Sequence, residues 1–346
     1  MTFLAVDGGN SKTDVAILAD DGRLLAAVRG PTASHQQVGL ERGMRVLADL
    51  VAQARSAAAL GDGERAGIAV HGLAGADTVT DARMLRRALE LAHLADANVV
   101  VNDAFLPIRA GTDRGWGVAL ICGSGVNAAG IAPDGRTARL AALGDISGDW
   151  GGGYDIGMAA LGAAVRARDG RGPRTTLEAG VPAALGYRRP LAVTRAIEAG
   201  RIPSSRLRGL APVVFAAARD GDVVARSILD RQADELVAMG TAIIRRLRLR
   251  RLDPVVIQAG GIFAATDAAF DARIRDGITA IAPRATVGRA EGLPVLGAAL
   301  LALDRTFEPG SARHAEASAR LRVTLGAWRP GSLGTDYGAG GPAIEK

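Results

Sequence analysis

Cysteine and aromatic residues are scarce in this chain of 346 residues, which has one cysteine, Cys122, and 3% aromatic residues. A single cysteine excludes an intrachain disulfide and any cysteine-based metal cage within one chain. With so few aromatic rings, the cores must be built mainly from Ala, Val, Leu and Ile. The hydrophobic content of 48% supplies enough of them for two domains of ordinary size.

Long apolar runs are missing as well. No run reaches the 18 or more residues that indicate a membrane span. The first residues, Met1–Asp7, lack the basic region of a signal peptide and reach an acidic residue at once. These absences predict a cytoplasmic protein with no membrane partner.

Positive charge is in excess, but it is not concentrated. The net charge of +6 comes from scattered arginines that 36 acidic residues offset, and no helix-turn-helix or zinc finger is present. We therefore expect no nucleic acid partner. One cluster, within residues 245–251, closes a long helical pattern, where cations suit the helix dipole; a docking patch for a polyanion is the alternative. Lysine is nearly absent, with only Lys12 and the terminal Lys346.

The chain shows one layout twice. A strand over residues 3–6, a glycine turn and a strand over residues 13–18 are followed by the hairpin Asp21-Gly22-Arg23. Near Trp116 a strand, a glycine turn and a second strand lead to Asp134-Gly135-Arg136, which matches the first hairpin at a shift of 113 residues. This layout is typical of an internal duplication, although the few identities leave chance open as the alternative.

The repeated layout predicts an α/β protein of two lobes. We expect an N-terminal lobe over residues 1–112 and a C-terminal lobe over residues 113–306, with a return of the last helix to the first lobe left open. From residue 307 to residue 346 periodicity fades, so this tail is expected to be flexible or packed on the surface.

Glycine-containing turns follow four apolar strands. Ligands bind at the carboxyl ends of strands in α/β sheets, and glycine lets backbone N–H groups close on phosphate oxygens. Neither a Walker A pattern nor a GxGxxG motif is present, which argues against P-loop and dinucleotide-binding folds. The four turns are Gly8-Gly9, Gly123–Gly125, Gly148–Gly153 and Gly260-Gly261.

From Phe3 to Leu303 the order of these turns resembles the N-acetylglucosamine kinase and BadF/BcrA ATPase group of the actin, hexokinase and Hsp70 superfamily. The resemblance implies two duplicated actin-like (ribonuclease H-like) lobes with an interlobe cleft, which closes on the sugar and expels water. Three loops carry the expected nucleotide contacts: Asp7-Gly8-Gly9-Asn10-Ser11-Lys12-Thr13-Asp14 as the first phosphate loop, Gly123-Ser124-Gly125-Val126-Asn127 as the second, and Gly260-Gly261 as the adenosine loop.

The resemblance also implies ATP and Mg²⁺. Asp7 is expected to hold Mg²⁺ through water, with a turn-capping role as its alternative, and Asp149 is a second candidate ligand. Asp103, after Asn102, falls where the family has its catalytic aspartate and would accept the proton of the sugar hydroxyl. The alternative for Asp103 is the N-cap of the segment 104–110, and for Asp149 the stabilisation of a glycine-rich turn.

The expected sugar contacts are Ser34, His35, Gly75 within the loop Gly72–Asp77, Asn102, Asp103 and Asp149. Three departures from the family pattern bear on the sugar. Ser34 replaces an asparagine, Leu143 stands where a tryptophan is common, and Trp150 replaces a glutamate. His35 is equally compatible with an ordinary surface loop.

These residues predict a kinase that transfers the γ-phosphate of ATP to a small-molecule sugar, N-acetylglucosamine or a related amino sugar, at the 6-hydroxyl by resemblance. A non-catalytic sensor of ATP and sugar, or a kinase for a different sugar, is the alternative. Two other functions are disfavoured. A dehydratase-activating ATPase would need two cysteines per chain, and this chain has only Cys122. A sugar-responsive repressor would need a DNA-binding segment, and no helix-turn-helix or zinc finger is present. Whether the chain forms a homodimer stays open.

Overall fold

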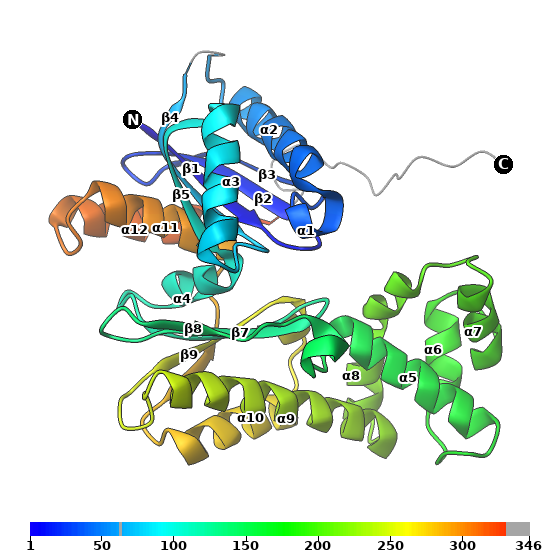
Figure 1. Ribbon diagram of the computed structural model, residues 1–346. Coiled ribbons are helices and arrows are strands. Elements are labelled where there is room, and N and C mark those ends of the chain that lie inside the picture. Colours follow the sequence, from blue (N-terminus) through cyan, green and yellow to red (C-terminus); the bar gives the residue numbers. More distant parts are fainter. Residues whose placement is uncertain (62–63, 330–346) are drawn as a thin grey trace. The chain divides into compact units, whose positions relative to one another are not determined.

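The computed structural model describes residues 1–61 and 64–329, and it divides the chain into two compact units (Figure 1). The first unit contains Met1–Gly115 and the chain from Ala290 onward, and the second contains Trp116–Arg289. Among the described residues, no helix combines the length and the apolar character that crossing a membrane would require.

The first unit is built on a five-stranded sheet of order β3-β2-β1-β4-β5. Strand β1 pairs antiparallel with β2 and parallel with β4, and β4 pairs parallel with β5. Along β1, Phe3 and Ala5 face one hydrophobic cluster while Leu4 and Val6 face another, so both faces of the sheet are buried. The strands are β1 (Thr2–Gly8), β2 (Thr13–Ala19), β3 (Leu24–Gly30), β4 (Ala66–Leu73) and β5 (Ala95–Asn102).

Helices cover both faces of this sheet. The cluster around Leu4 and Val6 is completed by α2 (Leu40–Ala57) and α3 (Val79–Ala92). The cluster around Phe3 and Ala5 is completed by α4 (Leu106–Gly111) and α11 (Pro294–Thr306). A short helix, α1 (His35–Val38), leads into α2.

The described part of the predicted tail contains a helix that the sequence did not indicate. Residues 312–324 form a helix, α12 (Ala312–Thr324), which begins at an N-cap where the Ser311 hydroxyl accepts from the His314 N–H. Leu321 and Trp328 are buried in the cluster that also holds Phe3. The helix was missed because its apolar positions are mostly alanine, which gives weak periodicity. The rest of the predicted tail, residues 330–346, lies outside the described residues.

The second unit repeats the sheet of the first, in the order β10-β9-β6-β7-β8. Its central strand again pairs antiparallel with the next strand and parallel with a later one, as β1 does. The predicted duplication is therefore confirmed at the level of topology. The strands are β6 (Gly117–Cys122), β7 (Val126–Ile131), β8 (Thr137–Arg139), β9 (Val255–Ala259) and β10 (Thr286–Arg289).

The two Asp-Gly hairpins have the same hydrogen bonds. In the first, Ala19 N donates to Arg23 O at 2.9 Å, and in the second Ala132 N donates to Arg136 O at 2.8 Å. Gly22 and Gly135 share a φ of +82°, which favours glycine. The match at a shift of 113 residues is therefore a match in structure as well as in sequence.

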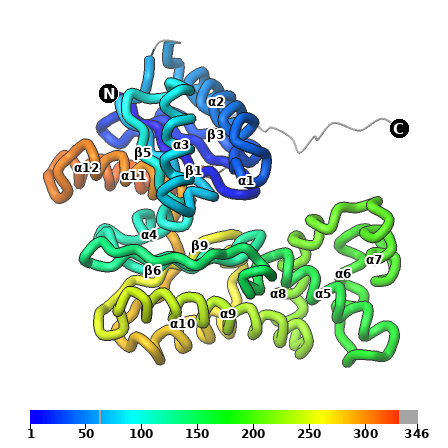
Figure 2. Tube along the Cα trace, in the orientation of Figure 1, coloured from blue at the N-terminus to red at the C-terminus, as the bar shows by residue number. Residues whose placement is uncertain are grey.

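One face of the second sheet packs on α9 (Val223–Arg246) and α10 (Ala268–Ile281). Between β8 and α9 the chain inserts a group of helices, and Figure 2 shows α6 and α7 together near one end of α5. The inserted helices are α5 (Gly152–Arg168), α6 (Leu177–Ala184), α7 (Pro190–Glu198), η3 (Ser204–Leu210) and α8 (Ala211–Arg219).

The compact units differ from the expected lobes at their borders. The expected borders were residues 112 and 306, whereas the units divide after Gly115 and after Arg289. The second border moves because α11 and α12 bury their apolar faces in the first unit.

Replacement of Gly297 in α11 should destabilise the first unit. A Cβ at this position would lie 2.0 Å from the backbone oxygen of Leu106, so Gly297→Ala forces α11 away from α4. We expect a loss of about 1–3 kcal/mol in the free energy of unfolding, measured by urea denaturation. The control is Gly162→Ala in α5, where a Cβ meets nothing within 4 Å and should stabilise the helix. Equal behaviour of both variants would contradict the close approach.

Candidate active site

Three loops of the first unit start at one level of the sheet. Gly8 at the end of β1 pairs with Leu73 at the end of β4, and Leu73 pairs with Asn102 at the end of β5. The carboxyl ends of these parallel strands therefore bring the first glycine turn, the loop 74–77 and Asp103 to the same edge. This is the edge at which α/β sheets bind ligands.

The first glycine turn joins β1 to β2, with Gly8 opposite Thr13. The segment after β3 holds this turn in place. The Thr32 hydroxyl donates to the carbonyl oxygen of Gly9 at 2.8 Å, and the Ser34 hydroxyl donates to Oδ1 of Asn10 at 2.7 Å. The turn containing Ser11 and Lys12 is thus fixed by hydrogen bonds from outside the hairpin.

Buried charges surround the base of this turn. The carboxylate of Asp14 is fully buried and accepts two hydrogen bonds from Arg29, at 2.5 and 2.6 Å. Burial, and then the nearby carboxylates of Asp14 and Asp103, raise the pKa of Asp7 well above its usual range. Burial also lowers the pKa of Lys12, an effect that the neighbouring Asp14 and Asp7 oppose. Asp7, Lys12 and Asp103 therefore share one electrostatic environment.

Asp103 lies beside the first glycine turn. Its Oδ2 is 3.9 Å from the point where a Cβ on Gly9 would stand. Asp103 opens the short helix η1 (Asp103–Phe105), whose N-cap is Asn102: the Asn102 Oδ1 accepts from the N–H of Ala104 at 3.1 Å. A side-chain cap for this segment is therefore supplied by Asn102.

The predicted sugar residues of the first unit lie around the loop Gly72–Asp77. The Asn102 Nδ2 donates to Oδ1 of Asp77 at 2.9 Å. Gly75 has a φ of +82°, and a Cβ there would lie 2.5 Å from Cε1 of His35. Nδ1 of His35 is buried and has no hydrogen-bond partner within the described part of the chain. The structure therefore brings His35, Gly75 and Asn102 together.

The second glycine turn lies on the start of helix α5. Gly153 N donates to Gly123 O at 2.8 Å, and Tyr154 N donates to Ser124 O at 3.1 Å. Gly152 must be glycine because a Cβ there would lie 2.4 Å from Cα of Gly125. The first N–H groups of α5 thus bind the carbonyl oxygens of the turn.

Gly260 and Asp149 also belong to the second unit. Gly260 follows β9 with a φ of +110°, and a Cβ there would lie 2.4 Å from the carbonyl oxygen of Cys122. Gly261 then opens the short helix η4 (Gly261–Ala264). The Asp149 carboxylate, in the predicted glycine-rich loop, accepts a hydrogen bond from the hydroxyl of Ser147, which directly precedes that loop. This contact matches the turn-stabilising alternative for Asp149, and its metal role stays a prediction.

Three polar residues at these turns escaped sequence reasoning. An Nη of Arg208 lies 3.5 Å from the Ser124 hydroxyl, and Oε1 of the buried Gln232 accepts from Gly152 N at 2.6 Å. Asp155 accepts from Gly151 N at 2.7 Å. A polar Gln232 among the apolar positions of α9 was the one available signal, because Arg208 is one arginine among many.

Trp150, one of the departures from the family pattern, has a local partner. Its ring lies 3.9 Å from the guanidinium carbon of Arg231 in α9, a cation–π contact. Leu143 is exposed, at 56% of its surface. Neither residue is placed by these contacts in a sugar-binding role.

Two sheets of one order, each with a glycine turn after its central strand, define the actin-like two-lobe fold of sugar kinases. A ROK family glucokinase from Streptomyces griseus, solved with glucose and AMPPNP, shares this fold with a TM-score of 0.52 and 18% identity, over 87% of this chain and 99% of that one. A candidate N-acetylglucosamine kinase from Chromobacterium violaceum gives a TM-score of 0.65 at 24% identity, over 87% of this chain and 98% of that one.

The family is defined by the sequence. The BadF/BadG/BcrA/BcrD ATPase family model matches residues 4–302, and the chain belongs to this family. It is 30% identical to the N-acetylmuramic acid/N-acetylglucosamine kinase of Clostridium acetobutylicum, over 75% of this chain and 84% of the relative. It is 25% identical to the N-acetyl-D-glucosamine kinase of Dictyostelium discoideum, over 87% of this chain and 98% of the relative. The predicted family and fold are confirmed.

The buried His71 of β4 should make stability depend on pH. Burial lowers the pKa of His71 to about 4, although its hydrogen bond to Asn98 opposes this. The unfolded chain, with an ordinary histidine pKa near 6.5, then binds more protons than the folded chain between about pH 4 and 6.5. Stability from neutral His71 is present above pH 6.5 and is lost as the pH falls through this window.

We expect the variant His71→Gln to remove this dependence. Relative to the wild type, its free energy of unfolding should improve by about 3 kcal/mol between pH 7 and pH 4, measured by urea denaturation at each pH. The exposed His93, replaced as His93→Asn, is the matched control and should show no such gain. A constant difference between His71→Gln and the wild type over this range would refute the assignment.

Proposed function

We propose that this protein phosphorylates an amino sugar, N-acetylglucosamine or a close relative, with ATP. The enzyme class is an ATP-dependent carbohydrate kinase, in keeping with the ATPase family and with the relatives of that class. The observation that carries the proposal is the carboxylate of Asp103 next to the first glycine turn, on the edge that also holds His35 and Gly75.

Asp103 is proposed as the general base. The sugar hydroxyl gives its proton to the Asp103 carboxylate while its oxygen bonds to the γ-phosphorus of ATP. The bond from that phosphorus to the oxygen bridging to the β-phosphate breaks, and ADP leaves with the electron pair. Such base assistance contributes about 10²–10⁴-fold, and positioning and charge stabilisation supply the remainder.

The glycine turns are proposed to hold the phosphates. In the first turn, Gly8, Gly9 and Asn10 offer backbone N–H groups, and the side chains of Ser11, Lys12 and Thr13 are further candidate donors. Lys12 sits near two buried carboxylates, so its ammonium is oriented by charge before a nucleotide arrives. In the second unit, the corresponding phosphate contacts are proposed for Gly123, Ser124 and Gly125. Arg208, next to the Ser124 hydroxyl, would add a positive charge there. Gly260 and Gly261 are proposed to contact the adenosine.

A magnesium ion fits the chemistry of Asp7. Its carboxylate is buried and has carboxylate neighbours, so a nearby cation would stabilise its ionised form. The described residues contain no cluster of three acidic, histidine or cysteine side chains that could hold a metal alone. Mg²⁺ bound to ATP commonly keeps several waters and needs one or two carboxylates. Asp7, through water, and Asp149 are the proposed contacts, and the ion would neutralise phosphate charge.

The identity of the sugar and of its hydroxyl rests on the relatives. Both curated relatives act on N-acetylglucosamine by name, and one also on N-acetylmuramic acid. His35 offers a buried ring nitrogen for a sugar oxygen. The Ser34 hydroxyl already donates to Asn10, so it also links the sugar segment to the phosphate turn. Phosphorylation at the 6-hydroxyl is part of the proposal.

The proposal is tested by ADP release with Mg²⁺-ATP against a panel of sugars. The panel contains N-acetylglucosamine, glucosamine, N-acetylmannosamine, N-acetylmuramic acid, anhydro-muramic acid and glucose. We expect strong turnover on one N-acetylated amino sugar, and phosphorus NMR of the product identifies the hydroxyl. Confirmed ATP binding with no turnover on any amino sugar would overturn the proposed substrate class.

The variant Asp103→Asn should keep the affinity for ATP and sugar but lower kcat by about 10²-fold or more, because the amide cannot accept the hydroxyl proton. Binding is measured by calorimetry and turnover by ADP release. A kcat near that of the wild type would remove Asp103 from the role of base.

The variant Lys12→Ala should weaken ATP binding, because a charge-assisted hydrogen bond to phosphate contributes about 1.5–3 kcal/mol. The expected change is at least about tenfold in Kd, measured by calorimetry. Arg45→Ala, which removes an exposed positive charge on α2, is the matched control. If both variants bind ATP like the wild type, the role of Lys12 is refuted.

A further inference from the structure

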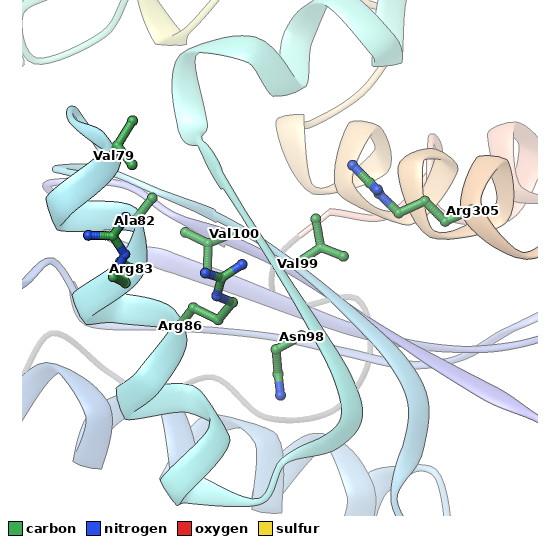
Figure 3. A pocket seen from close by; sticks show the side chains of 8 residues that line it. All are labelled: Val79, Ala82, Arg83, Arg86, Asn98, Val99, Val100 and Arg305. Atoms are coloured by element: carbon green, nitrogen blue, oxygen red, sulfur yellow. The ribbon is translucent and has the colours of Figure 1, made fainter.

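A hollow of the first unit lies away from the glycine turns, at the outer edge of β5. It has a volume of about 370 Å³ and is lined by residues of α3, β5 and α11 (Figure 3). β5 is the last strand of its sheet among the described residues, so the outer edge of its backbone faces this hollow with no strand partner there. Sheet edges of this kind offer backbone N–H groups to anions.

Three arginines line the hollow: Arg83 and Arg86 from α3 and Arg305 from α11. Figure 3 shows the side chains of Arg86 and Arg305 reaching toward β5 from its two sides, while Arg83 lies beside Ala82 on the outer part of α3. In the described part of the chain, these arginines form no ion pair and no hydrogen bond. Their neighbour Asp304 is already bound by Arg109 and His314. The positive charge is therefore uncompensated.

Asn98 adds a neutral donor to the same hollow. Its Oδ1 lies 3.0 Å from Nε2 of the buried His71, so the ring fixes the amide with its oxygen turned to the protein. The Nδ2 group of Asn98 has no acceptor among residues 1–61 and 64–329. Arg86, Arg305 and Asn98 together present only donors to whatever fills the space.

We propose that this hollow binds a phosphate monoester. A planar guanidinium group can donate hydrogen bonds to two oxygens of one phosphate. Two guanidinium groups on opposite sides of a strand edge can therefore bind one phosphate dianion between them. Val99 and Val100 border the hollow on the two faces of β5, and the exposed Val79 adds apolar surface that suits a small attached group such as a sugar ring. A volume of about 370 Å³ lies in the range of small-molecule sites.

Other occupants fit less well. The hollow follows β5 only from Asn98 to Val100, which is too short for an added peptide strand. In a second copy paired edge to edge, the arginines would face arginines of like charge. Charged side chains also protect a sheet edge from pairing, but that role requires neither a hollow of this volume nor the Asn98 amide that lines it.

The place of the hollow connects it to the candidate active site. β5 continues from Val100 to Asn102 and Asp103, and Val79 follows directly on the loop that ends with Asp77 and Thr78. Both walls therefore lead into residues proposed to bind and activate the sugar. If the proposed function holds, the phosphosugar product is itself a phosphate monoester, and its binding here is a route for feedback on turnover.

The test is titration of the full chain, observed through the side-chain amide of Asn98 by NMR. The probes are N-acetylglucosamine 6-phosphate, inorganic phosphate and unphosphorylated N-acetylglucosamine. We expect saturable shifts of the Asn98 amide with the first two probes and none with the third. Tighter binding of the phosphosugar supports an organic monoester as the ligand, and equal or tighter binding of inorganic phosphate would overturn the monoester in favour of free phosphate.

The variants Arg86→Gln and Arg305→Gln, alone and combined, should weaken this binding by about tenfold or more. Arg87→Gln, one position along the same helix and outside the lining, is the matched control and should bind like the wild type. Unfolding midpoints of all variants check that the fold is kept, and the single variants serve if the double variant unfolds.

Other results would also overturn the proposal. They are no saturable shift at Asn98, an unchanged affinity in the single or double variants, or an equal loss in Arg87→Gln. A shift produced only by an acidic peptide or an RNA oligonucleotide, added as competitors, would also overturn it. The NMR shifts at Asn98 do not depend on catalysis, so a failed kinase assay would not refute the phosphate site. An active kinase with no shifts at Asn98 would refute the phosphate site and leave the proposed kinase function standing.

Discussion

The parallel pairing of β1, β4 and β5 is the constraint on which the candidate site depends. Hydrogen bonds between these strands fix Gly8, Leu73 and Asn102 in one row, so three loops leave the sheet together. A slip of one residue would turn the side chains to the other face of the sheet and separate Asp103 from Gly9. Burial of apolar residues on both faces prevents that slip, because every displaced side chain would leave its cluster.

The layout of the sheets could be predicted because its signals are local. Alternating apolar residues mark the strands, and Asp21-Gly22-Arg23 and Asp134-Gly135-Arg136 need glycine at a positive φ. The position of α11 and the existence of α12 could not be predicted in the same way. Their burial is decided by contact with α4, where Arg109 and Asp304 pair across 195 residues, and with β1, which lies still farther away along the chain. Alanine-rich helices also show little periodicity of their own.

For the site, the sequence indicated the glycine turns and Asp103 but not what holds them. The pair Asp14–Arg29, the bond from Thr32 to Gly9 and the contact of Arg208 with Ser124 join residues that no motif relates. Each depends on a neighbour brought near by folding. The same holds for Asn102, whose amide both caps η1 and binds Asp77. Motifs locate reactive groups, whereas the bonds that fix their geometry come from tertiary structure.

The first unit is discontinuous, and this orders its assembly during synthesis. Its core combines Phe3 with Leu296 and Leu300, so the ribosome must make the whole of the second unit before α11 can cover the first sheet. Until then an apolar face of the nascent N-terminal sheet stays open to other chains, and the closing contacts span a long loop. The continuous second unit, by contrast, has its whole core synthesised before α11 is made.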